Sequence, residues 1–128
     1  MSDRFYFRQL LAGRDFARDD EIAQQMVNFV YLVGDRETGD AVAIDPAYGV
    51  DELVEILGAD GMRLTDVLVT HYHPDHVGGS LGRWRIEGLA ELLARDDVSA
   101  KVHVQEPEAF GVKRVTGCSD SDLVTHAS

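Results

Sequence analysis

The most distinctive stretch of this sequence is Thr70-His71-Tyr72-His73-Pro74-Asp75-His76-Val77-Gly78-Gly79, and the rest of the chain is interpreted from it. It holds three of the chain's five histidines, and one carboxylate, within six positions. Imidazole and carboxylate groups are poor core material unless a partner satisfies them, so packing alone does not explain the cluster. These side chains are common metal ligands, and their short spacing predicts a metal site rather than a histidine-rich surface loop.

The spacing of the four side chains predicts how they share metal ions. Residues i and i+2 of an extended chain project to the same side, so His71 and His73 can reach one ion. Pro74 then ends the strand, which lets Asp75 and His76 point toward a second position close by. Imidazole together with carboxylate suits Zn²⁺, Fe²⁺ or Mn²⁺ better than Ca²⁺ or Mg²⁺. Two adjacent ions can hold a shared hydroxide, because metal binding lowers the pKa of water from about 16 toward roughly 7.

A short apolar run, Val67-Leu68-Val69-Thr70, leads directly into the cluster and predicts a central strand. In open α/β sheets the carboxyl ends of the strands carry the chemistry, and the cluster begins at such an end. Alternating, β-branched or aromatic segments predict further strands at residues 5–11, 26–33, 41–44 and 101–105. The first of these is expected at the edge of the sheet. A hairpin turn at 34–40 is expected between the second and the third.

Helices are expected between and after these strands. Apolar residues at i, i+3, i+4 and i+7 spacing predict helices over residues 50–57 and 86–93. Pro107 is favourable in a first helical turn, so a short helix through Phe110 is expected. No clear period is found in two segments, which are expected to be loops: residues 13–25 and 117–128.

The composition is that of one globular domain with a strongly acidic balance. The chain has 128 residues, of which 45% are hydrophobic and 27% charged, so it is long enough to bury a core. Its formal net charge of −11 argues against nucleic acid and anionic membrane surfaces as partners, since both attract mainly Lys and Arg. An anionic small-molecule substrate is compatible with this charge, because bound divalent cations offset it locally.

The cellular compartment is predicted from the cysteine content and the N-terminus. Cys118 is the only cysteine, so no internal disulfide can form, which fits a reducing cytosol. The first residues lack a charged-then-apolar signal pattern, and no apolar run approaches membrane-spanning length. We therefore expect a soluble cytoplasmic protein.

The motif His71-Tyr72-His73-Pro74-Asp75-His76, between its apolar strand and Gly78-Gly79, resembles the HxHxDH signature of the metallo-β-lactamase superfamily. Ile44-Asp45-Pro46, after a hairpin beginning near Asn28, resembles the strand pair that precedes this signature in the family. The resemblance runs from about residue 26 to residue 104. It is nearest to the glyoxalase II-like branch, whose members hydrolyse thioesters. It implies the α/β (α+β) class and an αββα sandwich, with the metals at one edge between two sheets.

The resemblance implies a role for each polar residue of the motif. His71 and His73 match ligands of a first metal, whereas Asp75 and His76 match ligands of a second. Two Zn²⁺ ions are implied for the complete site, with Fe²⁺ or Mn²⁺ as alternatives. Asp45 matches an acid that steadies the ligands without binding metal itself. An Asp before Pro is also a common turn former at a strand end, which is the alternative for Asp45.

The family also has ligands that this motif does not supply. A third histidine in a Gly-His-Thr context, a bridging acid and a last histidine normally follow further along the chain. His103 and His126 are the two histidines left here. His103 is expected on the polar face of its strand, which argues against ligation. His126 stands about where the third histidine belongs but lacks the flanking Gly and Thr, so a surface loop histidine is the alternative.

We therefore expect residues 1–128 to be the N-terminal part of a single metallo-β-lactamase-like domain whose second half is missing. Half of a sandwich leaves one sheet face uncovered, and an exposed apolar face needs a partner. The fragment is accordingly expected to dimerise or aggregate, and not to complete the reaction alone.

Three functions remain open at this point. The leading one is a metal-dependent hydrolase of a thioester or ester, similar to hydroxyacylglutathione hydrolase, in which a metal-bound hydroxide attacks the carbonyl and Asp75 orients it. The second is a mononuclear iron dioxygenase of the same fold that acts on a persulfide. The third is an inactive half-domain that binds metal or pairs with another chain. Arg83, Trp84 and Arg85 are expected either at a pocket mouth or at a solvated helix start.

Overall fold

The computed structural model describes residues 3–127, and within them the main element is a six-stranded mixed sheet. Its strand order is β1-β2-β3-β4-β7-β8. The first three strands are antiparallel neighbours, whereas β3, β4, β7 and β8 run parallel. The bounds of these strands are β1 (Phe5–Leu11), β2 (Phe29–Asp35), β3 (Asp40–Ile44), β4 (Arg63–Val69), β7 (Lys101–Gln105) and β8 (Leu123–His126).

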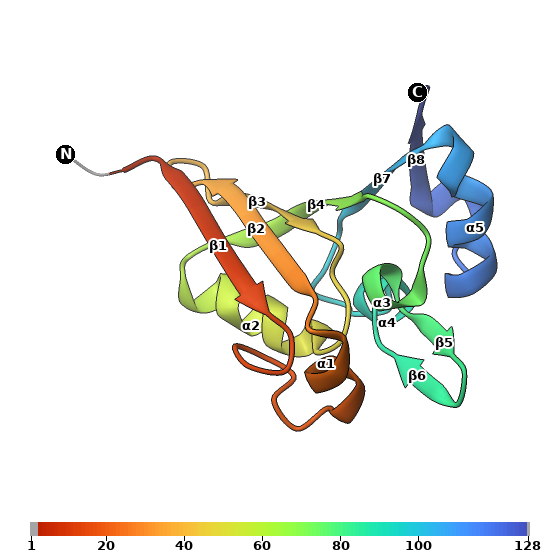
Figure 1. Ribbon diagram of the computed structural model, residues 1–128. Helices are drawn as coiled ribbons and strands as arrows, with labels where there is room; N and C mark the ends of the chain where they lie inside the picture. The colour runs from red at the N-terminus through yellow and green to blue at the C-terminus, as the bar shows by residue number, and fades with distance from the viewer. Residues whose placement is uncertain (1–2, 128) are drawn as a thin grey trace.

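The helices lie mainly on one side of this sheet, and a small hairpin lies beside them (Figure 1). Figure 1 shows α2 beneath the strands, α1 next to it, and α3 and α4 together near the hairpin of β5 and β6. The bounds of these elements are α1 (Glu21–Met26), α2 (Val50–Ala59), α3 (Pro74–Val77), α4 (Leu89–Leu93), α5 (Glu106–Thr116), β5 (Gly79–Leu81) and β6 (Trp84–Ile86). Among residues 3–127, no helix is long and apolar enough to cross a membrane.

The two faces of the main sheet differ in burial. The face that meets the helices carries buried side chains, two on each strand except β8: Tyr6, Leu10, Val30, Leu32, Ala41, Ala43, Val67, Val69, Val102 and Val104. Each valine or leucine among them stabilises the fold by about 1.5–3 kcal/mol when fully buried. The other face exposes large apolar side chains: Phe5, Phe7, Phe29, Leu68 and Val124. Within the described residues, this face of the sheet therefore presents exposed apolar side chains.

A β-bulge between β3 and β4 keeps the apolar residues on the covered face. The register of this parallel pair shifts between Ala41 and Val42, because Ala41 pairs with Leu64 and Val42 pairs with Asp66. Thr65 is the extra residue, and its hydroxyl donates to the carbonyl of Ala41 at 3.3 Å. Past the bulge, Asp66 lies on the open face and the strand continues toward the metal-type cluster with its valines buried.

Several predicted elements are confirmed by the structure. The strand over residues 5–11 is an edge strand, the hairpin over 34–40 joins two antiparallel strands, and the helix predicted at 50–57 is α2. The strand before the cluster is central, as expected, since β4 lies between β3 and β7. His103 is on the open face of β7, between two buried valines.

The expectation of a loop over residues 13–25 was wrong for its last part. Helix α1 begins after Asp20, whose carboxylate accepts hydrogen bonds from the amides of Ile22 and Ala23 at 3.1 and 3.3 Å. The helix has six residues, too short for a hydrophobic period to show in the sequence. Because α1 continues to Met26, strand β2 starts three residues later than predicted.

The predictions for the C-terminal third were also corrected in three places. The helix expected at 86–93 is only α4, because Gly88 precedes it and Ile86 belongs to β6. The helix expected at 107–110 is longer and forms α5. The segment expected as loop at 117–128 contains a 3-10 turn (Asp120–Asp122) and β8, which pairs with β7 at the sheet edge. An edge strand of four residues with exposed side chains leaves little apolar pattern to recognise.

Candidate metal centre

The metal-type cluster lies where β4 ends and the chain turns into a short helix. His71 to His73 follow β4 without regular structure, and α3 begins at Pro74, where the missing backbone N–H is tolerated. The helix stops at Gly78, which has φ +89°. A Cβ atom at Gly78 would lie 2.7 Å from the backbone of Gly88, so this tight turn requires glycine.

The structure brings the four predicted ligands together. The ring centroids of His71 and His76 are 4.1 Å apart, and those of His71 and His73 are 4.8 Å apart. Nε2 of His76 lies 3.4 Å from Oδ2 of Asp75. Three imidazoles and one carboxylate therefore lie near one another at the carboxyl end of a central parallel strand, and metal binding by these four residues stays a prediction.

Asp45 is the buried acid beneath this group. It follows β3 with φ +52°, a left-handed conformation that turns its carboxylate toward the end of β4. Oδ1 accepts a hydrogen bond from the amide of Thr70 at 2.8 Å, and Oδ2 accepts one from the Thr70 hydroxyl at 2.5 Å. Oδ2 also lies 3.2 Å from Nδ1 of His76. Both carboxylate oxygens of Asp45 thus accept hydrogen bonds from protein donors. This is the arrangement expected of an acid that orients metal ligands and does not bind the metal itself.

These hydrogen bonds determine which nitrogen of each histidine is available. Thr70 has one hydroxyl proton and gives it to Asp45, so the same oxygen accepts from Nδ1–H of His71, 2.9 Å away. His76 likewise donates Nδ1–H to Asp45. Both imidazoles are therefore held in the tautomer that leaves Nε2 with a free lone pair, which is the form that binds a metal.

The charges of the Asp45–His76 pair stabilise each other. Burial alone would raise the pKa of Asp45, but the hydrogen bonds from His76 and Thr70 outweigh it and hold that pKa below its ordinary value. The hydrogen bond to Asp45 raises the pKa of His76, against the opposing effect of burial. A protonated His76 keeps its bond to Asp45 in the metal-free chain, so protons and metal ions compete for Nε2.

The donor set fits a divalent transition metal. Within the described residues, one ligand atom from each of Asp45, His71 and His76 forms a group in which all three atoms lie within 4.8 Å of one another. This group holds two of the four predicted ligands and neither His73 nor Asp75. Two ligand atoms on one tetrahedral zinc ion, each about 2.0–2.1 Å from it, are about 3.3 Å apart. Nε2 of His76 and Oδ2 of Asp75 are 3.4 Å apart, which matches that separation. No hydrogen bond between these two atoms sets this distance in the described residues. Nitrogen with carboxylate oxygen is also the ligand chemistry that zinc and iron accept.

Asn28 is a polar neighbour of this site that the sequence indicated only as the start of a hairpin. Its Nδ2 donates to Oδ2 of Asp75 at 2.8 Å and to the backbone carbonyl of Asp75 at 2.9 Å. An amide directly before a buried strand was the available signal, but its contact lies 47 residues away in the sequence. Spacing rules along the chain do not show such a contact.

The two remaining histidines lie together on the open face of the sheet. Nε2 of His103 is 2.7 Å from Oδ2 of Asp66, and its Nδ1 is 3.0 Å from Nε2 of His126. Asp66 thus fixes the proton of His103 on Nε2, and His126 donates to the other nitrogen. His126 lies in β8 rather than in a loop, and its described hydrogen bond is to His103 and not to the motif. The structure gives this pair no place among the converging ligands.

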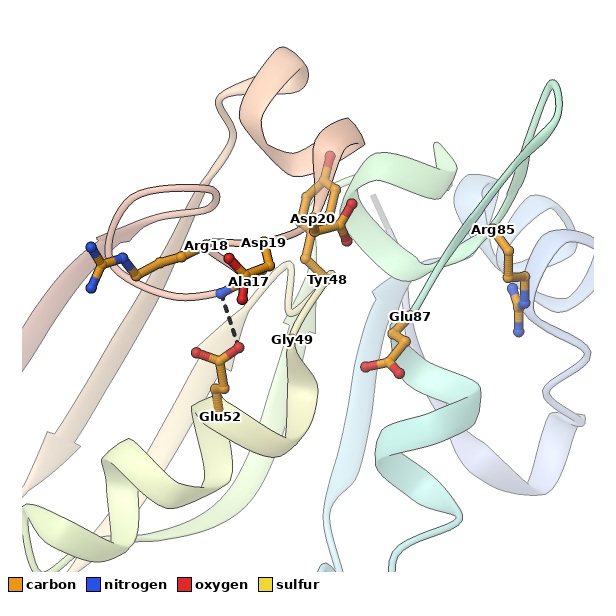
Figure 2. Close-up of a pocket in the computed structure, with 9 residues that line it drawn as sticks. All are labelled: Ala17, Arg18, Asp19, Asp20, Tyr48, Gly49, Glu52, Arg85 and Glu87. Carbon is orange, nitrogen blue, oxygen red and sulfur yellow. Dashed lines mark hydrogen bonds between the residues drawn. The ribbon is translucent and has the colours of Figure 1, made fainter.

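A separate cavity of about 530 Å³ opens on the helix side of the molecule (Figure 2). Its walls carry charges of both signs, and Figure 2 shows Glu52 accepting a hydrogen bond from the amide of Ala17 at 3.0 Å. Arg85 lines this cavity, whereas Trp84 packs against the core. Both belong to the β5–β6 hairpin, so the expected helix start is wrong at these residues and a position at a pocket wall holds for Arg85. None of the predicted metal ligands lines the cavity.

Tyr48 is a buried aromatic residue of that cavity wall. Its hydroxyl is enclosed and has no hydrogen-bond partner within the described residues. Burial raises the pKa of Tyr48, and the negative charges of Asp75 and Asp20 raise it further. Tyr48 also has a left-handed backbone, with φ +73°.

Comparison with known proteins places this geometry in a family. The sequence profile of the metallo-beta-lactamase superfamily matches residues 24–104, more than half of the chain. Over 103 residues the chain is 39% identical to a hydroxyacylglutathione hydrolase of Rhodopseudomonas palustris strain BisB5, which covers 77% of this chain and 38% of that protein. The chain spans about a quarter to two fifths of the length of such curated relatives.

Solved structures show the same fold. A metallo-beta-lactamase from Staphylococcus aureus superposes with a TM-score of 0.57 at 20% identity, covering 81% of this chain and 24% of that one. ETHE1 from Myxococcus xanthus superposes with a TM-score of 0.52 at 28% identity, covering 77% and 34%. The mixed α/β architecture expected from the sequence is thus confirmed, over part of the fold. The chain belongs to the metallo-β-lactamase superfamily.

Proposed function

We propose that this chain carries the first half of a two-metal hydrolase site acting on thioesters or esters. The observation that carries the proposal is the convergence of His71, Asp75 and His76, with free ring nitrogens on the two histidines and a 3.4 Å separation between Asp75 and His76. His71 and His73 form the first metal position, and Asp75 with His76 forms the second. Zinc is the ion we propose, because the donors are nitrogen and carboxylate oxygen.

The protein groups each have a defined task in this proposal. Divalent ions, when bound, lower the pKa of water and polarise a carbonyl. Asp75 orients the attacking oxygen through its carboxylate. Asp45 keeps His76 in the tautomer that binds metal, and through Thr70 it does the same for His71. Because Asp45 is buried and hydrogen-bonded on both oxygens, it holds these rings without competing for the ion.

The substrate class is inferred from the relatives. Curated relatives that are 39% identical over 75 and 103 residues are named hydroxyacylglutathione hydrolases, so we propose an acylated glutathione or a similar thioester. A small molecule is consistent with the acidic surface, which disfavours nucleic acid and anionic membranes. The chain covers 38% of the length of one such relative, so we propose this activity for the whole protein rather than for these residues alone.

The alternative is a mononuclear iron persulfide dioxygenase of the same fold. Metal content separates the two functions. The chain is purified from cells supplied with both zinc and iron, and each metal is measured per chain by mass spectrometry. Zinc without iron supports the hydrolase, whereas one iron per chain with oxygen consumption on a persulfide supports the dioxygenase.

A chimera tests the reaction itself. Residues 24–104 replace the matching segment of the Rhodopseudomonas relative, which supplies the rest of the fold. We expect the chimera to release thiol from an acylglutathione, and the same chimera with His73→Ala to fold but lose this activity. A folded, zinc-loaded chimera without thioester hydrolysis would contradict the proposed function.

A further inference from the structure

Asn28 and Asp75 form a contact that fixes both the side chain and the backbone of one proposed metal ligand. An amide group has two N–H donors, and the two described contacts of Nδ2 are both on Asp75. One reaches Oδ2 at 2.8 Å and the other reaches the backbone carbonyl at 2.9 Å. We propose that Asn28 is a positioning residue that holds the Asp75 carboxylate in place for the second metal, an inference that rests on the proposed function.

The backbone of Asn28 is held tightly enough to serve as such an anchor. Its carbonyl accepts a hydrogen bond from the amide of Ala12 at 2.9 Å, and strand β2 begins at the next residue, Phe29. On the other side, Val27 ends α1 in a left-handed conformation with φ +49°, and its amide donates to Ala23 at 3.1 Å. A β-branched residue rarely adopts this conformation, and such outliers gather where the surrounding fold must aim a particular group.

The geometry leaves Asp75 able to bind an ion while Asn28 holds it. A carboxylate oxygen has two lone-pair positions, so Oδ2 can accept from Asn28 and still face an ion. The same Oδ2 lies 3.4 Å from Nε2 of His76. Without the amide, the carboxylate is free to rotate about its own side-chain bonds, and the spacing to His76 is no longer set. Asn28 therefore controls the distance between two donors of one metal position.

In the proposed second metal position, each of the two ligands is held by a hydrogen bond from a different part of the sheet. Asp45, after β3, holds His76 through Nδ1. Asn28, before β2, holds Asp75 from the other side. Loss of a supporting hydrogen bond of this kind typically weakens metal binding by about 10–100-fold. A purely structural role, in which Asn28 only ties α3 to β2, predicts a less stable chain whose metal binding is unchanged once it is folded.

The test uses Co²⁺ as the probe, because its absorption reports the number and type of ligands. The 128-residue chain is titrated with Co²⁺ as the wild type, as Asn28→Leu, which keeps the shape without a donor, and as Asn28→Ala. Gln9→Leu is the matched control, since within the described residues the side-chain amide of Gln9 donates to the hydroxyl of Tyr31, away from the motif. We expect both Asn28 variants to lose about 10–100-fold in one binding step, with a changed Co²⁺ spectrum, and Gln9→Leu to behave as the wild type. Circular dichroism confirms that each titrated variant is folded.

A double-mutant cycle separates positioning from general stability. If Asn28 acts through Asp75, then adding Asn28→Leu to Asp75→Asn costs no further affinity. Equal losses in the presence and absence of the Asp75 carboxylate would overturn the inference, as would wild-type Co²⁺ binding in both Asn28 variants. Those results leave the proposed function standing. A wild-type chain that binds no Co²⁺ overturns the proposed function, and the inference with it.

Discussion

Oδ2 of Asp45 lies 3.2 Å from Nδ1 of His76, and this contact joins the end of β3 to the helix that carries the metal-type motif. Asp45 is buried, and the same carboxylate accepts two hydrogen bonds from Thr70. Its removal leaves donors without partners in a closed site. The contact is therefore expected to matter both for folding and for metal binding.

We expect Asp45→Ala to lower the free energy of unfolding by about 1–3 kcal/mol, the usual effect of leaving a buried donor unsatisfied. Metal affinity should fall by about 10–100-fold in the same variant, because His76 and His71 lose their fixed tautomers. Urea denaturation measures the first effect and zinc titration the second. The control is Glu55→Ala on the exposed side of α2, where both quantities should stay near wild type. A stable Asp45→Ala chain with unchanged zinc affinity would refute this role.

The glycine that ends α3 is expected to be irreplaceable. Gly78→Ala places a Cβ atom 2.7 Å from the backbone of Gly88 and at φ +89°, so it should lower the free energy of unfolding by more than about 1 kcal/mol. Gly58→Ala is the matched change, because Gly58 lies in α2 with open space around its Cβ position. That variant should gain about 0.5–1 kcal/mol from helix propensity. Thermal or urea unfolding measures the stability of both variants. Similar effects of the two changes would argue against the described turn at Gly78.

The Asp66–His103 pair predicts a pH dependence of stability. The hydrogen bond from His103 holds the pKa of Asp66 below its ordinary value, with a further contribution from Thr65. A carboxyl whose folded pKa is lowered stabilises the fold fully above its unfolded pKa, near 4, and loses this effect as the pH falls toward the folded pKa. Asp66→Asn should therefore cost up to about 1 kcal/mol at pH 5, and this difference should shrink by pH 3. Urea unfolding at both pH values measures it, and a gap that widens toward pH 3 would contradict the sign.

The open sheet face predicts self-association of the chain. Phe7 is 49% exposed on this face and stacks near Phe5 and Tyr31, so the aromatic side chains form a continuous apolar surface. We expect sedimentation velocity to show dimers or larger species at micromolar concentration, and Phe7→Lys to reduce them. Phe110 is 71% exposed on α5, away from this face, and Phe110→Lys is the matched control. A monomeric wild type, or equal effects of both variants, would contradict this prediction.

The part of the site that the sequence predicted is the part that is local in the chain. His71, His73, Asp75 and His76 fall within six residues, so strand and turn geometry alone indicate that they converge. The strands and helices with a strong apolar period were predicted for the same reason, β4 and α2 among them. Their existence was clearer than their ends, because a period does not show where a cap or a left-handed residue stops it.

The rest depends on contacts between distant segments. Asn28 meets Asp75 only because β2 and the turn after β4 are neighbours in the folded sheet, and α1 was missed because it has six residues. His126 was considered for the metal on its position along the chain, but the pairing of β8 with β7 places it beside His103. The cytoplasmic location, and the assignment of residues 1–128 to part of a longer domain, stay predictions.

Zinc content per chain tests the central claim most directly. The purified chain is dialysed against a small excess of Zn²⁺, separated from free metal and analysed by mass spectrometry, as the wild type, as His76→Ala and as His103→Ala. We predict that the wild type and His103→Ala retain zinc to the same extent and that His76→Ala loses at least one ion per chain. A wild type without bound zinc, or a loss caused by His103→Ala and not by His76→Ala, would contradict the metal site at residues 71–76.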